Sequence, residues 1–271
     1  MNSDTSAVFR LRRGTAPLLI SMPHIGTIVP AEVQPQLALA SASLADTDWH
    51  LDRLYDFAEG LGATVLHATI SRYVIDLNRP ADDESLYPGQ TTTGLCPGET
   101  FRGEALYPGG TVVDPTEKAR RLEAYWKPYH QTLREELERL VALHGAVLLW
   151  DAHSIASVLP RLFEGKLPDL NFGTSDGRTC DPAIIDSVLA AAQRFLFTSV
   201  LNGRFKGGHI TRHYGAPLAG VHAIQLEMCQ CLYMEESAPF EYLQDVAEWV
   251  QPAVRAMLEA GLEQIKKLST R

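Results

Sequence analysis

Residues 146–154 read Ala-Val-Leu-Leu-Trp-Asp-Ala-His-Ser, an apolar run of strand length that ends abruptly in Asp151 and His153. In α/β enzymes, ligands and catalytic groups lie at the carboxyl ends of buried strands, so this stretch predicts a strand with a functional tip. An earlier stretch, residues 16–24, has the same form, because Ala-Pro-Leu-Leu-Ile-Ser-Met-Pro ends at His24. Two histidines at strand ends indicate a metal site at one edge of a sheet.

The chain as a whole shows strands that alternate with helices. Apolar periodicity predicts strands at 7–12, 16–22, 63–70, 73–77, 146–154, 197–201 and 221–227. Helices are expected from Asp46 to about residue 61, at 115–144 and at 240–267. This pattern is typical of a three-layer α/β fold, in which helices flank a central sheet. The sheet should be mixed, because some connections are too short for a helical crossover.

One long segment, residues 80–112, interrupts this pattern. Prolines and glycines recur through it, so we expect an irregular loop, and loops of this length are usually functional lids or partly disordered. The 271 residues contain no internal repeat and suit one large domain. The sequence therefore predicts a single domain over residues 1–271.

Composition excludes several classes of function. The net charge of −9, without a basic cluster, argues against a nucleic-acid partner. No apolar run reaches the roughly 18 residues of a membrane span, and the polar first residues do not resemble a signal peptide, so a cytoplasmic protein is expected. The four cysteines are scattered apart from Cys229 and Cys231, and we expect them to be reduced and structural. Nothing in the sequence indicates an oligomeric state.

A metal site formed by His24 and His153 needs a third ligand. Zinc hydrolases usually hold the metal with three His, Asp or Glu side chains and leave one position open for water. Asp48 and Asp52 lie near the start of the expected helix and are i,i+4 neighbours, so either can turn inward. The competing interpretation is that both only complement the helix dipole at the surface.

A hydrolase also needs a general base, and Glu227 is the candidate. It closes the apolar strand 221–227, where burial raises the pKa of a carboxyl group. Strand alternation puts Gln225 on the same face. The alternative is a strand terminus that faces solvent.

A third polar group lies in residues 71–80. Asn78 and Arg79 follow an expected strand and offer an amide beside a guanidinium fork, which is the geometry that binds a carboxylate. An Asp–Arg structural pair is the competing interpretation of this segment.

Together these segments resemble the N-formylglutamate amidohydrolase (N-formylglutamate deformylase) family, over most of the chain from about residue 17 to 236. The matching motifs lie at 21–26, 46–55, 71–80, 86–90, 150–154, 202–208, 211–215 and 222–227. The resemblance implies a zinc-dependent hydrolase that converts N-formyl-L-glutamate to formate and L-glutamate, the last step of a histidine degradation route. It also implies a fold like that of the zinc carboxypeptidases and aspartoacylases.

The resemblance further implies a role for each candidate residue. The metal ligands are His24, Asp48 and His153, the base is Glu227, and Asn78 with Arg79 forms the carboxylate clamp. In the relatives the first histidine and the acid lie three residues apart, whereas 24 positions separate His24 from Asp48. Asp52 therefore stays a rival ligand.

The mechanism that follows uses one divalent metal, expected to be Zn²⁺. Zinc lowers the pKa of water and polarises the formyl oxygen, while Glu227 removes the water proton and passes it to the departing amine. Arg72 or Arg212 is the candidate for stabilising the oxyanion. Specificity would depend on gripping both carboxylates of a small anionic N-acyl amino acid. The residues available for the side-chain carboxylate are Arg204, Lys206 and Arg212, assisted by His209 or His213.

Three other interpretations stay open. Asp151-Ala-His153 is similar to a signature of two-manganese ureohydrolases, but Ile155 stands where their last aspartate would be, so Asp151 is better interpreted as orienting His153. The same fold also suits another N-acyl amino acid or a small peptide as substrate. A non-catalytic metal or amino-acid binding protein is the third possibility, and an intact Glu227 argues against it.

Overall fold

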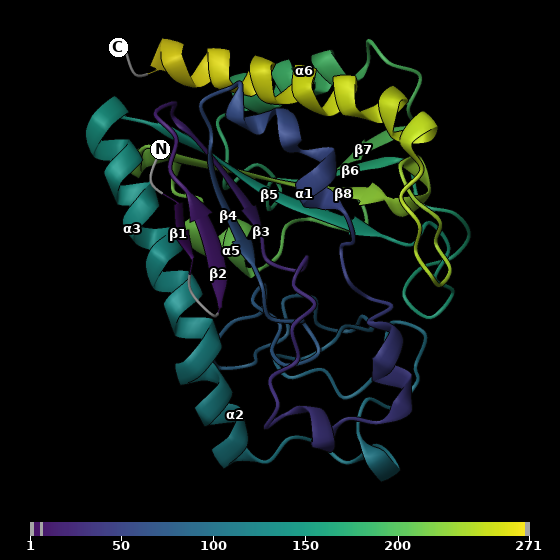
Figure 1. The fold of residues 1–271 in the computed structure, drawn as a ribbon. Coiled ribbons are helices and arrows are strands. Elements are labelled where there is room, and N and C mark those ends of the chain that lie inside the picture. Colours follow the sequence, from purple (N-terminus) through teal and green to yellow (C-terminus); the bar gives the residue numbers. More distant parts are fainter. Residues whose placement is uncertain (1–2, 6–7, 269–271) are drawn as a thin grey trace.

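An eight-stranded sheet runs through the centre of the protein, in the order β1-β2-β4-β3-β5-β8-β6-β7 (Figure 1). The coordinates are a computed structural model that describes residues 3–5 and 8–268. The strands are β1 Ser3–Thr5, β2 Phe9–Arg12, β3 Leu18–Met22, β4 Thr64–Ala68, β5 Val147–Ile155, β6 Leu170–Gly173, β7 Ser199–Leu201 and β8 Val221–Cys229. The α-helices are α1 Leu51–Leu54, α2 Pro115–Arg121, α3 Lys127–His144, α4 Pro182–Ala192, α5 His209–Tyr214 and α6 Gln244–Leu268.

Helices cover both faces of this sheet. Along β5, side chains point alternately to opposite sides, so Leu148 and Trp150 enter the hydrophobic cluster shared with α1, α4 and α6. Val147 and Leu149 enter the cluster shared with α3 and α5 on the other face. Figure 1 shows α6 along the top of the sheet and α3 down the left side. The predicted three-layer α/β fold with a mixed sheet is confirmed.

The four central strands run parallel, and this positions the polar residues. β4, β3, β5 and β8 pair in parallel, whereas β2 pairs with β4, and β6 with β8, in antiparallel fashion. The carboxyl ends of the parallel strands therefore meet at one edge. The β5–β8 register aligns Asp151 with Gln225 and His153 with Glu227.

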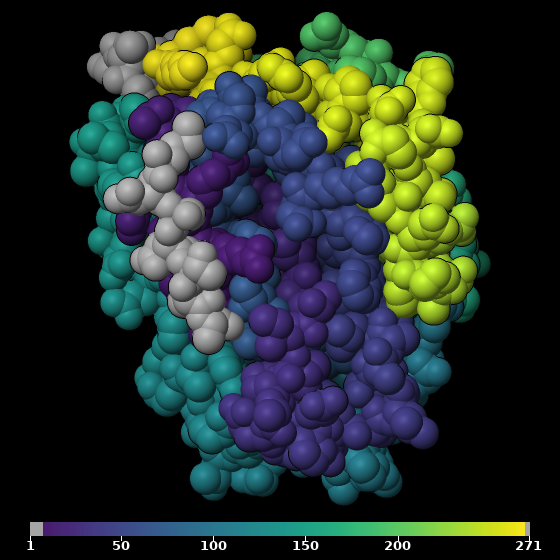
Figure 2. All heavy atoms as spheres, in the orientation of Figure 1, coloured from purple at the N-terminus to yellow at the C-terminus, as the bar shows by residue number. Residues whose placement is uncertain are grey.

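The helix expected from Asp46 to about residue 61 is wrong in its first half. Residues 46–50 form a turn, and only α1 and a short 3-10 helix, Asp56–Glu59, follow. The backbone N–H of Asp48 donates to the carbonyl of His24 at 3.0 Å, and His50 adopts a left-handed φ of 62°, so the chain bends before it becomes helical. The segment after β3 forms much of the face below α6 in Figure 2.

The strand expected at 73–77 is also wrong. The segment after β4 is a series of turns, in which the Val74 N–H donates to Ser71 and the Asp76 N–H to Leu95. Its apolar side chains are nevertheless buried. The segment resembles a strand in sequence because all five of its residues are buried, although its backbone turns.

The remaining predictions differ from the structure mainly in length. The helix 115–144 is continuous but contains a π-helical segment, Leu122–Trp126, between α2 and α3. Residues 80–112 are irregular apart from a 3-10 turn at Pro108–Gly110. The sequence patterns missed β6, α4 and α5, and residue 7 of the strand expected at 7–12 lies outside the described residues. Among the helices that the structure describes, none is long and apolar enough to cross a membrane.

Candidate active site

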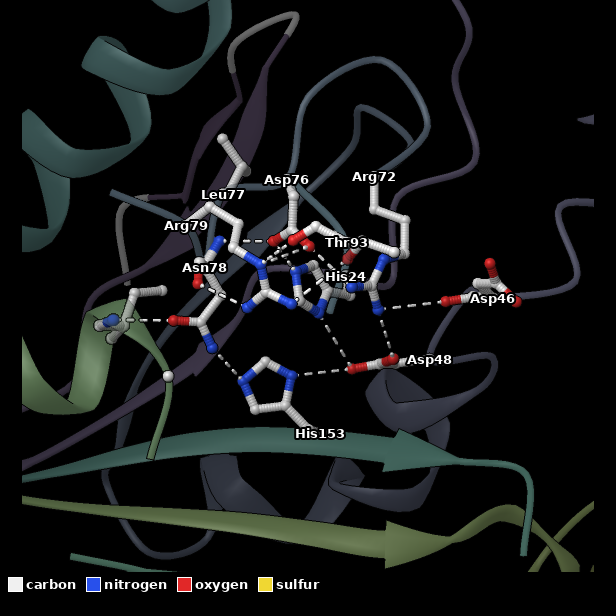
Figure 3. Close-up of polar contacts among 12 residues, drawn as sticks. His24, Asp46, Asp48, Arg72, Asp76, Leu77, Asn78, Arg79, Thr93 and His153 are labelled. Atoms are coloured by element: carbon white, nitrogen blue, oxygen red, sulfur yellow. Dashed lines mark hydrogen bonds and ion pairs between the residues drawn. The ribbon is translucent and has the colours of Figure 1, made fainter. Parts of the chain in front are cut away.

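His24, Asp48 and His153 form a buried group at the carboxyl edge of the sheet (Figure 3). Asp48 Oδ2 lies 3.0 Å from His153 Nδ1 and 3.7 Å from His24 Nδ1. One ligand atom from each residue lies within 4.8 Å of the others, and all three side chains are buried. Two imidazole nitrogens and a carboxylate oxygen in this arrangement form the donor set that a divalent metal such as Zn²⁺ prefers.

Local structure explains why Asp48, and not Asp52, joins this group. Asp48 lies in the turn before α1, whose backbone is tied to the His24 carbonyl. Asp52 lies inside α1, where its side chain is exposed and accepts a hydrogen bond from the Arg53 N–H at 3.0 Å. Because the helix starts only after residue 50, the two acids do not share a helix face.

The second nitrogen of each histidine meets a carboxylate. His24 Nε2 lies 2.6 Å from Asp76 Oδ1, and His153 Nε2 lies 3.0 Å from Asp151 Oδ1, the latter without the alignment of a hydrogen bond. Metal-binding histidines are commonly oriented by a carboxylate on the far nitrogen. Each ring therefore presents Nδ1 toward Asp48, which fits a metal held by His24, Asp48 and His153.

Arg72 lies among three aspartates beside this group. Its Nη2 donates to Asp76 Oδ2 at 2.7 Å, and its Nη1 lies 4.0 Å from Asp48 Oδ1 and 3.4 Å from the Asp46 carbonyl (Figure 3). Burial alone would raise the pKa of Asp76, but the interaction with His24 and the positive charge of Arg72 hold that pKa well below its usual value. Asp76 is therefore a carboxylate that supports both His24 and Arg72.

Glu227 is buried at the end of β8, beside His153 on β5. Burial, the largest cause, raises the pKa of Glu227 to about 8, with the Asp48 charge adding to this effect. Its Oε2 accepts a hydrogen bond from Gln225 Nε2 at 3.2 Å. A carboxyl group with a pKa near neutrality is suited to accept and then release a proton.

These residues line one cavity together with two more arginines, Arg79 and Arg204. Arg79 donates to Thr93, from Nε to the carbonyl at 2.7 Å and from Nη2 to Oγ1 at 3.3 Å. Arg204 donates to the carbonyls of Leu162 and Thr91. The loop at 80–112 contributes part of the wall through Tyr87, Thr91, Thr92, Thr93 and Phe101.

Some of the predicted residues lie elsewhere or are already engaged. Lys206 pairs with Asp176 at 3.1 Å, Arg212 donates to the Leu86 and Gly207 carbonyls, and the exposed His213 stacks on His209. None of Lys206, Arg212 and His213 lines the cavity.

Asn78 does line the cavity, but both its amide oxygen and its amide nitrogen contact other groups of the protein. Its Oδ1 accepts the Ile210 N–H at 2.7 Å, and its Nδ2 lies 3.2 Å from Asp151 Oδ2 and 2.8 Å from His153 Nε2. Asn78 therefore holds the β5 strand end and α5 together next to Arg79.

Sequence reasoning missed Asp76 as a site residue and the wall formed by Thr91–Thr93. The competing interpretation of its segment, an Asp–Arg structural pair, is met by Asp76 and Arg72, but nothing in the pattern predicted that Asp76 would also contact His24. The run of three threonines within a Gly- and Pro-rich loop was the available signal for the wall.

The fold and the site together define an α/β amidohydrolase with a buried His-Asp-His group. A family model described as N-formylglutamate amidohydrolase matches residues 16–234. The chain therefore belongs to the N-formylglutamate amidohydrolase family, which confirms the resemblance found in the sequence.

Similar proteins agree with this assignment. N-formylglutamate deformylases from Pseudomonas aeruginosa and Pseudomonas putida are 54% and 51% identical to this chain over 258 and 256 residues, covering 94% of it and 96% of each relative. A crystal structure of N-formylglutamate amidohydrolase from Ralstonia eutropha JMP134 superposes with a TM-score of 0.81 at 27% identity, over 98% of this chain and 99% of that one. A gene product of Agrobacterium tumefaciens, 18% identical over 96% of this chain and 97% of its own, shares the fold with a TM-score of 0.74.

Proposed function

We propose that this protein hydrolyses N-formyl-L-glutamate to formate and L-glutamate, using one divalent metal, most simply Zn²⁺, at His24, Asp48 and His153. The observation that carries the proposal is the cavity lined by this buried group, Glu227 and three arginines. The names of the two Pseudomonas relatives support the substrate. The reaction is the step that the family resemblance places at the end of histidine degradation.

Glu227 is the proposed general base. A metal held by the His-Asp-His group supplies Lewis-acid polarisation of the formyl carbonyl and lowers the pKa of water. The Glu227 carboxylate takes a proton from the attacking water, whose oxygen bonds to the formyl carbon. The same carboxyl group then delivers that proton to the nitrogen as the C–N bond breaks, so formate and the free amine of glutamate leave.

Arg72 is the proposed stabiliser of the developing oxyanion. Its guanidinium lines the cavity and is held rigidly, because it is buried, bonded to Asp76 and stacked 4.6 Å from the centre of the Phe101 ring. A charge fixed in advance stabilises a transition state without reorganisation. Arg212, the other candidate, is held by loop carbonyls outside this cavity.

Arg79 and Arg204 are the proposed partners of the two substrate carboxylates. Arg79 follows the segment that supports the metal group, which favours the α-carboxylate next to the scissile amide. Arg204 comes from a different segment of the chain, after β7, and suits the side-chain carboxylate. An N-formyl amino acid with an uncharged side chain would leave one guanidinium without a carboxylate partner. This favours a dicarboxylic substrate over other N-acyl amino acids.

The test is a metal analysis of the purified protein paired with formate release from N-formylglutamate, N-formylaspartate and N-acetylglutamate. We expect one equivalent of zinc and preferred turnover of N-formylglutamate. Glu227→Gln should keep the metal and lower kcat by about 100-fold or more, because general-base catalysis is removed. Near-normal formate release by this variant would remove Glu227 from the mechanism, and no turnover of any of the three compounds would reject the proposed function.

A further inference from the structure

Three consecutive backbone carbonyls lead into the proposed carboxylate-binding arginine, and each accepts a hydrogen bond from a helix. The Trp126 indole Nε1 donates to the carbonyl of Arg79 at 2.9 Å, and His130 Nε2 donates to that of Leu77 at 2.8 Å. The backbone N–H of His209, in α5, donates to the carbonyl of Asn78 at 3.3 Å. The segment 77–79 is irregular, so these bonds replace the ones that a sheet or helix would give it.

The π-helical segment of the long helix explains how two of these donors reach their carbonyls. Leu122–Trp126 lies between α2 and α3 and ends at Trp126 itself. A π-turn holds an extra residue, so it rotates the side chains that follow it relative to an uninterrupted α-helix. Trp126 and His130 are four residues apart and therefore face the same side of the helix, with their ring centroids 3.7 Å apart.

His130 is itself fixed in one orientation. Its Nδ1 lies 2.9 Å from the Tyr214 hydroxyl of α5, and its Nε2 must carry a proton because the Leu77 carbonyl can only accept. The side chain is buried. The Trp126 ring thus stacks on a rigid imidazole and cannot swing away from Arg79 without losing that contact.

Arg79 is held at both ends as a result. Its carbonyl is tied to Trp126, and its guanidinium is tied to Thr93 in the loop wall. Its Nη1 lies 3.4 Å from the Asn78 carbonyl, and the Arg79 side chain lines the cavity. Because substrate recognition by a guanidinium depends on the direction of its fork, the backbone anchor at Trp126 sets how well that fork meets a carboxylate.

We propose that Trp126 is a positioning residue for substrate binding, acting through the backbone of Arg79. The inference rests on the proposed function, in which Arg79 binds a carboxylate of the substrate. The competing role is purely structural, with Trp126 only stabilising the packing of α3 against the sheet.

Trp126→Phe separates the two roles, because it removes the indole N–H and keeps an aromatic ring on His130. We expect KM for N-formylglutamate to rise about 3- to 10-fold, the effect of losing one hydrogen bond. Turnover number and metal content should stay within twofold of the wild type. In an Arg79→Ala background the same substitution should raise KM no further, because the guanidinium that Trp126 positions is absent.

A matched control and a binding measurement complete the test. Trp249→Phe makes the same exchange at an exposed site on α6 and should leave KM unchanged. Titration with L-glutamate, which is not turned over, should give a higher Kd for Trp126→Phe than for the wild type. In the Arg79→Ala background the same substitution should leave Kd unchanged. An unchanged KM and Kd in Trp126→Phe, or an equal rise with and without Arg79, overturns the inference. If the variants differ in Kd for L-glutamate as expected but the wild type releases no formate, the proposed function is rejected and the inference about Trp126 stands.

Discussion

Arg204 differs from the other two arginines of the cavity in its surroundings. Arg72 lies among three aspartates, and Arg79 Nε lies 4.0 Å from Asp76 Oδ2. Among the described residues, Arg204 bonds only to backbone carbonyls and packs on the rings of Tyr87 and Phe205. Partial burial lowers the pKa of Arg204, and no carboxylate among the described residues forms an ion pair with it. A substrate carboxylate would supply the missing charge.

Arg204→Ala is therefore expected to change which substrates are preferred. The ratio of kcat/KM for N-formylglutamate over N-formylglutamine should fall by about 10-fold or more, because only the charged side chain gains from the guanidinium. Kinetics with both compounds measure this ratio. Lys206→Ala is the control, since that cation is bonded to Asp176 outside the cavity. An equal loss with both compounds would contradict a role in recognising the side-chain carboxylate.

At this scale, the sequence predicted the metal group better than its supports. His24 and His153 were accessible to sequence reasoning because each ends an apolar run, and the structure brings both to Asp48. The choice between Asp48 and Asp52 depended on where the helix begins, which the composition of that segment does not reveal. Lys206 and Arg212 are near Arg204 in sequence, yet Lys206 pairs with Asp176 and Arg212 lies in α5, bonded to the Gly207 and Leu86 carbonyls.

Among the elements, the ends of β3 and β4 are joined by backbone packing at Gly26. A Cβ atom added at Gly26 would lie 2.3 Å from the Ile70 carbonyl oxygen, closer than any real contact. Just beyond, the Ile28 N–H donates to Thr69 at 2.9 Å, so the two chains continue side by side past the strands. His24 lies in the turn that this contact holds in place.

Gly26→Ala should consequently damage both stability and metal binding. Forcing the two backbones apart is expected to cost about 1–3 kcal/mol in the free energy of unfolding, as overpacking usually does. Urea unfolding and metal analysis measure the two effects. Gly98→Ala is the matched control, because a Cβ atom there meets nothing within 4 Å and no positive φ is required. If both variants were equally stable, the close approach would carry no energetic weight.

The elements also show where periodicity fails as a guide. The segment 73–77 resembles a buried strand because all of its residues are buried, but the Asp76 N–H bonds to Leu95 in a distant loop instead of a neighbouring strand. α4 was missed although Asp181 caps it and Pro182 starts it, because the segment is apolar on most sides and lacks a clear polar face. The sequence patterns predicted correctly that these segments are buried, but they could not predict which part of the chain each segment bonds to or packs against.

In the whole molecule, buried neutral histidines gather between α3, α5 and the sheet. Burial lowers the pKa of His130 to about 3 and, with the neighbouring His213 charge, that of His209 to about 4. In the unfolded chain a histidine has a pKa of about 6.5. Below that value the unfolded state binds protons that the folded state does not, so stability is lost as pH falls.

We therefore expect the free energy of unfolding to decrease between pH 6.5 and pH 4.5 and to be insensitive to these histidines above pH 7. His130 should contribute a slope of at most about 1.4 kcal/mol per pH unit in this window. His130→Gln keeps a donor for the Leu77 carbonyl and should reduce the slope. Denaturant unfolding of both proteins across this range measures it, and parallel curves would show that His130 does not titrate on unfolding.

The origin of the three proposed metal ligands has a consequence for how the protein responds to its surroundings. Asp48 and His153 are 105 positions apart in the chain, and His24 comes from yet another turn. A cation bound to all three therefore acts as a reversible cross-link, closing two long loops that the unfolded chain leaves open. Well above saturation, each tenfold increase in free metal adds about 1.4 kcal/mol to stability. For the metal proposed at this group, the supply of free metal would set the stability of the folded protein as well as its activity.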